Sequence, residues 1–155
     1  MLDDHGRAMT ISILARPEGL WTKVADFIPS GHKLIFKVAK GSHWTSDPDK
    51  ASCSAEGQVR DATNLLVPWA PTGCLVGKVG GSTADNTAPP AAVAASAGAA
   101  PAVTAPALFV FAVGSFCMVQ VPSAVSGPLF LTMNDSAANF GKHSGSVDLQ
   151  IFEAP

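Results

Sequence analysis

Hydrophobic and polar side chains alternate along several short segments of the chain, most clearly in 33–40 and 146–152. The apolar face consists of Leu34, Phe36 and Val38 in the first segment and of Val147, Leu149 and Ile151 in the second. A period of two is typical of a β-strand with one buried face and one face in water. Similar patterns predict strands at 9–14, 20–28, 73–79, 108–113, 116–121 and 128–133.

Clusters of glycine, proline and serine separate these segments, and no long stripe of apolar residues has the helical period. Many short strands divided by turns predict an all-β fold, namely a small jelly roll or antiparallel β-sandwich. The length of 155 residues suits one domain over 1–155.

Two stretches interrupt the strand pattern. The polar segment 41–64 is predicted to be one long loop, and loops of that length in compact domains are often functional. The segment at about 83–107 consists almost entirely of Ala, Pro, Thr and Ser. We interpret it as a low-complexity surface insertion with a short alanine-rich helical turn around 91–100.

The overall charge is small. Charged residues make up 14% of the chain, hydrophobic residues 47%, and the net charge is −2. This balance favours neither nucleic acid nor an anionic membrane as a partner, and so low a charge suggests further surface buried in a homo-oligomer. No apolar run approaches the roughly 18–20 residues that span a bilayer, and the polar start lacks the apolar core of a signal peptide. We therefore expect no membrane insertion and a soluble protein, cytoplasmic or exported without a cleaved signal peptide.

Catalytic motifs are missing from the sequence, which contains no GxSxG, HExxH, Walker A or GxGxxG pattern. The three cysteines include no CxxC pair, and their odd number argues against a disulfide framework. We expect Cys74 and Cys117, which lie in apolar runs, to be buried, and Cys53, between serines, to be exposed. The chain is predicted not to be an enzyme.

One loop combines several oxygen-bearing groups. An apolar strand ends in Asn134-Asp135, and Ser136 and Asn139 follow before the last strand begins. A carboxylate, amide oxygens and backbone carbonyls in a short arc suit a hard cation such as calcium or the hydroxyls of a sugar. The same residue types are also ordinary turn formers.

The last third of the sequence resembles the calcium-dependent galactophilic LecA-like (PA-I) family of bacterial lectins. The resemblance rests on 121–127, on Asn134-Asp135, and on Phe140-Gly141-x-x-Ser144-Gly145-Ser146 in the family's order. Further support comes from segments 13–15, 29–31 and 73–80. The resemblance therefore covers most of the chain, except the insertion and part of the long loop. It implies a jelly-roll β-sandwich, like the strand pattern, and a carbohydrate-binding lectin with galactose-type ligands.

In that family a calcium ion bridges protein and sugar. The resemblance places its ligands at Asp135, at a carbonyl of Asn139, at a carbonyl near Trp44 or Thr45, and at two asparagines replaced here by Lys142 and His143. An ammonium repels a metal ion, and histidine is a poor ligand for calcium. We therefore favour no cofactor. If calcium is retained, Asp135, Asn139 and Thr45 hold it. The histidine and glutamine with which the family contacts the sugar have no secure match here, and Arg60 and Thr63 lie nearby by ungapped counting.

These replacements lead to a narrower hypothesis, in which Lys142 takes the place of the ion beside Asp135. The pocket, made by 41–45 and 135–143, then binds a sugar without metal. An alternative is a structural or adaptor domain that has lost sugar binding.

The three tryptophans are expected to differ in role. Trp44 lies in the polar segment and is predicted to present its ring to a sugar, whereas Trp69 is predicted to be a packing residue. Trp21 is assigned to the core or to a subunit contact.

Overall fold

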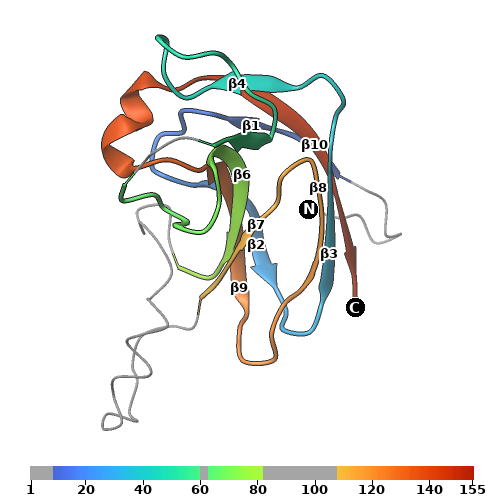
Figure 1. Ribbon diagram of the computed structural model, residues 1–155. Coiled ribbons are helices and arrows are strands. Elements are labelled where there is room, and N and C mark those ends of the chain that lie inside the picture. Colours follow the sequence, from blue (N-terminus) through green and yellow to red (C-terminus); the bar gives the residue numbers. More distant parts are fainter. Residues whose placement is uncertain (1–8, 60–62, 82–107) are drawn as a thin grey trace, which may run out of the picture.

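The chain folds into two antiparallel β-sheets packed face to face (Figure 1). The computed structural model describes residues 9–59, 63–81 and 108–155. Within these ranges the elements are β1 (Met9–Leu14), β2 (Thr22–Ile28), β3 (Lys33–Val38), β4 (His43–Thr45), β5 (Glu56–Gln58), β6 (Thr72–Val79), β7 (Phe109–Ala112), β8 (Phe116–Gln120), β9 (Gly127–Met133), the 3₁₀ helix η1 (Ala137–Lys142) and β10 (Ser144–Ala154).

The first sheet has the order β1-β10-β3-β8, with β4 paired to the start of β10. The second sheet has the order β2-β9-β6-β5, with β7 also paired to β6. Consecutive strands often lie in different sheets, so the chain crosses repeatedly between the layers. The prediction of an all-β antiparallel sandwich is confirmed.

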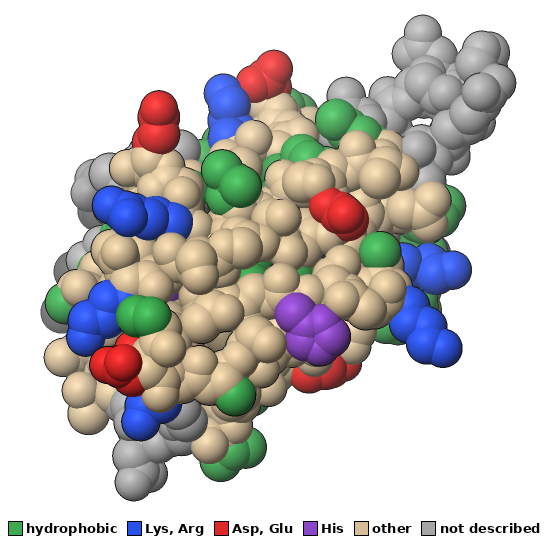
Figure 2. Space-filling view, turned by 90° about the horizontal axis from the view of Figure 1, so that it is seen from above, with side chains coloured by type: hydrophobic (Ala, Val, Ile, Leu, Met, Phe, Trp, Pro, Cys, Tyr) green, Lys and Arg blue, Asp and Glu red, His purple; other side chains and the backbone are tan. Residues whose placement is uncertain are grey.

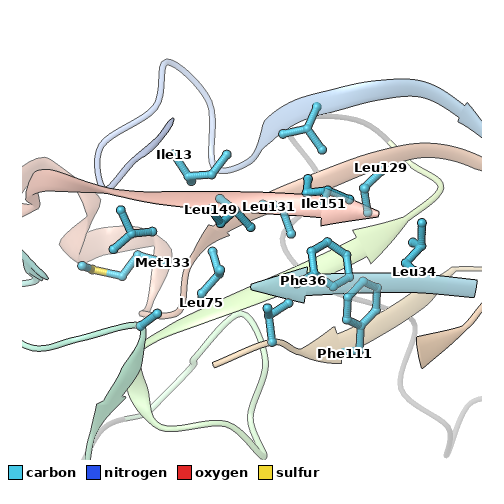
Figure 3. Close-up of a cluster of buried hydrophobic side chains, with 14 of the residues drawn as sticks. Ile13, Leu34, Phe36, Leu75, Phe111, Leu129, Leu131, Met133, Leu149 and Ile151 are labelled. Carbon is cyan, nitrogen blue, oxygen red and sulfur yellow. The ribbon is translucent and has the colours of Figure 1, made fainter. Parts of the chain in front are cut away.

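The main core fills the space between the sheets (Figure 3). Most strands contribute every second side chain, so the alternation seen in the sequence becomes an inner face and an outer face. The labelled inner residues are Ile13, Leu34, Phe36, Leu75, Phe111, Leu129, Leu131, Met133, Leu149 and Ile151.

A second hydrophobic cluster covers the outer face of the second sheet. All eight residues of β6 are buried, because this strand has a core on both sides. The members of this second cluster are Trp21, Leu66, Val67, Ala70, Cys74, Val76, Phe130 and Phe140. Lys78 is also buried there, with its Nζ 4.7 Å from the Trp21 ring centroid and 4.8 Å from that of Phe130. This cluster anchors both η1 and the segment 66–70 against the sheet.

Several sequence predictions need correction. The segment 41–64 is not one loop, since it contains β4 and β5, whose three residues each are too short to show a pattern. Residues 137–142 form a 3₁₀ helix rather than an irregular loop. The insertion at about 83–107 and its helical turn lie outside the described residues, and a single domain over 1–155 stays a prediction.

The cysteines also differ from expectation in part. Cys74 is buried as predicted, and burial raises the pKa of its thiol to about 11. Cys53 is buried rather than exposed, because its backbone pairs with that of Trp44 in an isolated antiparallel β-bridge. Cys117 is half-buried.

Among the described residues, no helix has the length and apolar character needed to traverse a bilayer.

Candidate functional site

The loop after β9 is fixed by hydrogen bonds from a single buried side chain, Asn134. Its Oδ1 accepts a hydrogen bond from the Val67 N–H at 2.9 Å. Its Nδ2 lies 3.0 Å from the carbonyl oxygen of Val67, 2.9 Å from that of Ala70 and 3.2 Å from that of Pro71. Because Asn134 is fully buried, it holds the segment 67–71 in one position relative to the end of β9.

Asp135 is the centre of a buried polar network. Its Oδ1 accepts hydrogen bonds from the Ser136 N–H at 2.7 Å and from Asn139 Nδ2 at 3.3 Å. Its Oδ2 lies 2.9 Å from Nε2 of His143. Burial raises the pKa of the Asp135 carboxyl, but the hydrogen bonds from His143, Ser136 and Asn139 outweigh it, and the pKa ends below its usual value.

The geometry determines which atoms of the network carry protons. Nδ1 of His143 lies 2.8 Å from the carbonyl oxygen of Ala15, which can only accept, so Nδ1 carries a proton. An ionised Asp135 can also only accept, so both ring nitrogens of His143 face acceptor oxygens. The His143 side chain has no exposed surface.

A pocket of about 640 Å³ opens beside this network. One wall is formed by residues between Thr63 and Pro68, and the other by Ser136 and the first turn of η1. The walls are joined where Leu65 bridges to Ser136 and where the Leu66 N–H donates to the Asp135 carbonyl oxygen at 3.0 Å. The volume falls within the range of small-molecule sites.

The described residues that line this pocket are uncharged. Its polar members are Thr63, Asn64 and Ser136, and its apolar members are Leu65, Leu66, Pro68, Ala137 and Ala138. Asn64 has a φ of 58°, a left-handed conformation that residues with a side chain seldom adopt and that is often found at functional sites. Ser136 precedes η1, yet its hydroxyl makes no capping hydrogen bond. Its hydroxyl is therefore not used by the helix.

A second depression of about 430 Å³ lies on the other side of η1. It is more open to solvent and is bordered by Arg16 and Glu18 together with Phe140 and Gly141. Because the larger pocket adjoins the Asp135 network, we take that pocket as the candidate site.

The end of the molecule that carries β4 and η1 shows charges of both signs that are spread out rather than gathered in one patch (Figure 2). Figure 2, seen from above in the orientation of Figure 1, shows a largely uncharged surface with acidic and basic side chains scattered around it. Such a surface has no strong field of either sign that would attract a highly charged ligand.

The structure brings together only part of the predicted site. Asp135, Ser136, Asn139 and His143 lie in one network. Thr45 pairs with Ser144 in the β4–β10 ladder, next in sequence to His143. Lys142 is exposed and forms no ion pair with Asp135, so the hypothesis that Lys142 replaces the ion is wrong. The neighbouring His143 contacts the carboxylate instead.

The tryptophan predictions are also corrected. Trp44 is 1% exposed and its Nε1 donates to the Gly73 carbonyl oxygen at 2.7 Å, so its ring cannot stack on a sugar. The short strand β4 turns this side chain inward against Cys53. Trp69, predicted to pack, is 64% exposed, whereas Trp21 lies in the second hydrophobic cluster.

The wall formed by 63–68 was missed by the sequence prediction. The one signal was the ungapped alignment that placed Thr63 near the sugar, and Thr63 does line the pocket. Arg60, which the same alignment suggested, lies outside the described residues.

The residues present do not fit a calcium ion. Both oxygens of Asp135 already accept hydrogen bonds, and the buried imidazole of His143, a poor ligand for calcium, occupies the position facing Oδ2. Calcium requires six to eight oxygen ligands. Within 9–59, 63–81 and 108–155, no group of three or more His, Cys, Asp and Glu side chains is placed to hold a metal.

Comparison with solved structures shows a lectin domain with a similar fold. The N-terminal domain of EclA, described as a PllA-like lectin, superimposes with a TM-score of 0.59 at 13% sequence identity, covering 95% of this chain and 98% of that domain. No protein-family model and no curated protein matches the sequence. At this identity the likeness concerns the fold.

Proposed function

We propose that this chain is a non-enzymatic, LecA-like carbohydrate-binding module whose ligand occupies the pocket between 63–68 and 136–138. The observation that carries the proposal is the lining of that pocket, whose described residues combine hydroxyl and amide groups with apolar side chains and carry no charge. Sugars present both hydroxyls and apolar C–H faces, so they match such a lining. The lectin fold of the EclA domain is a further support.

The ligand class follows from the residues of each wall. The hydroxyls of Thr63 and Ser136 and the amide of Asn64 can donate and accept hydrogen bonds, as sugar hydroxyls do. Pro68 and Ala137 offer apolar contact to the ring. Among the described residues of this lining, a phosphate or a carboxylate has no cationic partner, so we propose a neutral glycan. The resemblance to LecA makes galactose-type sugars the first to be tested.

A titration by nuclear magnetic resonance tests the proposal. Galactose and galactosides are expected to shift backbone amide signals of 63–68 and 136–138 in the wild-type protein. In the Ser136→Leu variant the shifts should weaken by at least about tenfold in affinity, because the leucine fills the pocket and removes a hydroxyl. Ser123→Leu, at an exposed serine in the β8–β9 loop, is the matched control and should bind as wild type.

An adaptor role without sugar binding is the alternative. It predicts that no glycan shifts the signals of either wall, while an intact fold persists. A glycan array that shows no binding for the wild-type protein would favour the adaptor role.

We also propose that the chain forms a homo-oligomer through the β8 edge of the first sheet. Met118 is 65% exposed on β8, an edge strand that carries no charged residue and no proline. Ile35 lies beside it in register, and Phe152 lies beside Ile35, so an apolar stripe crosses three strands. Edge strands are usually protected by charges or proline, and a second copy that pairs with β8 would provide that cover.

A further inference from the structure

His143 connects three parts of the chain, one of them distant in sequence. Its Nδ1 donates to the Ala15 carbonyl oxygen just after β1, and its Nε2 donates to Asp135 just after β9. Its own backbone lies between η1 and β10. The Ala15 N–H in turn donates to the Gly145 carbonyl oxygen at 2.9 Å. A metal ion often serves as such a crosslink between loops.

The surroundings of His143 supply what a buried cation requires. The Asp135 carboxylate provides the opposite charge at 2.9 Å, and the Ala15 carbonyl oxygen satisfies the other N–H. The Phe140 ring lies against the imidazole, with centroids 4.4 Å apart. A cation near an aromatic ring gains a further attraction. No donor of the ring is left without an acceptor.

The same contacts oppose the binding of a metal at Asp135, because the His143 ring occupies the space facing Oδ2. Each oxygen of Asp135 accepts a hydrogen bond, and the acid is almost fully buried. Calcium could enter only after the imidazolium had left, and this would break both hydrogen bonds of His143.

We propose that His143 is an internal cation that replaces a bound metal in this loop, so that the loop is ordered and any sugar is bound without calcium. The part of this inference that concerns sugar rests on the proposed function. The part that concerns the loop does not, because it depends on the His143 contacts alone.

The protonation of His143 is the most direct test. In the wild-type protein at neutral pH, the ¹⁵N resonances of the His143 ring are expected to be those of an imidazolium, with a proton on both nitrogens. A neutral ring, with one unprotonated nitrogen, would overturn the proposal. His43, exposed on β4, serves as the internal comparison.

Calcium supplies the second test. Thermal melting of the wild-type protein should give the same midpoint in millimolar calcium and in EDTA. The double variant Lys142→Asn/His143→Asn places two amide oxygens next to Asp135, and its midpoint should rise in calcium because only a ligand of the native state stabilises it. Lys142→Asn alone retains the imidazolium and should not respond.

The outcomes separate the two proposals. A saturable calcium affinity in the micromolar range for the wild-type protein would overturn the internal cation. An imidazolium without any glycan binding would retain the internal cation and overturn the proposed function. If the double variant fails to fold, the ring resonances and calcium titration of the wild-type protein still decide.

Discussion

Nε2 of His143 lies 2.9 Å from Oδ2 of Asp135, and both side chains are buried. This ion pair lies at the base of the loop that forms one wall of the candidate pocket. It holds Asp135 in place while Ser136, the next residue, lines the pocket. The pair therefore connects the stability of the loop with the shape of the site.

Removal of the cation should strongly destabilise the fold. His143→Leu leaves the Asp135 carboxylate buried without a counter-charge, and breaking a buried pair in this way typically costs about 3–5 kcal/mol. Urea denaturation measures the change in the free energy of unfolding. Lys142→Ala, one residue earlier and exposed, should change it by no more than about 0.5 kcal/mol. Similar losses for both variants would contradict the assignment of the cation to His143.

The free energy of unfolding at acidic pH should depend on Asp135. Its pKa in the folded protein lies below the usual value of 3.8, so its ionised form stabilises the fold above that pH. This contribution is lost as the pH falls through the folded pKa, because the carboxylate must then be protonated. Denaturation series between pH 7 and pH 2 should show a steeper decline for the wild-type protein than for Asp135→Asn. Parallel curves would show that the pair contributes nothing.

Asn134 should be essential for the other wall of the pocket. Asn134→Ala leaves the Val67 N–H and several carbonyl oxygens without a partner in the interior. We expect a loss of about 2–4 kcal/mol in the free energy of unfolding. Hydrogen exchange should show the Val67 amide losing protection before those of β9. Unchanged protection at Val67 would contradict this role.

The alternation of apolar residues was sufficient to predict the sandwich, because most of the longer strands, such as β3 and β10, bury one face and expose the other. The short strand β4 shows where this signal ends. Three residues cannot display a period, so Trp44 was assigned to an exposed loop although pairing with β10 turns it inward.

The site was harder to predict for a different reason. Asp135 and Ser136 could be recognised from their positions after a strand. The role of His143 depends on a carbonyl oxygen of Ala15, 128 positions away in the chain, and no local pattern reports such a contact. The pocket wall at 63–68 likewise depends on the hydrogen bonds of Asn134.

The exposed β8 edge leads to a prediction on assembly. Met118→Lys places a charge in the middle of the apolar stripe, so it should shift the protein toward the monomer in analytical ultracentrifugation. Thr10→Lys is the matched control, since it adds the same charge on β1, the strand at the opposite edge of the sheet. A wild-type protein that stays monomeric at the highest concentration measured would rule out this interface.

The most direct test of metal-free sugar binding is a glycan array probed in EDTA and again in calcium. The account predicts that the wild-type protein binds the same neutral, galactose-containing glycans in both buffers and that Ser136→Leu loses them while Ser123→Leu does not. Binding only in calcium would contradict the internal cation, and binding in neither buffer would contradict the assignment of this pocket to a sugar.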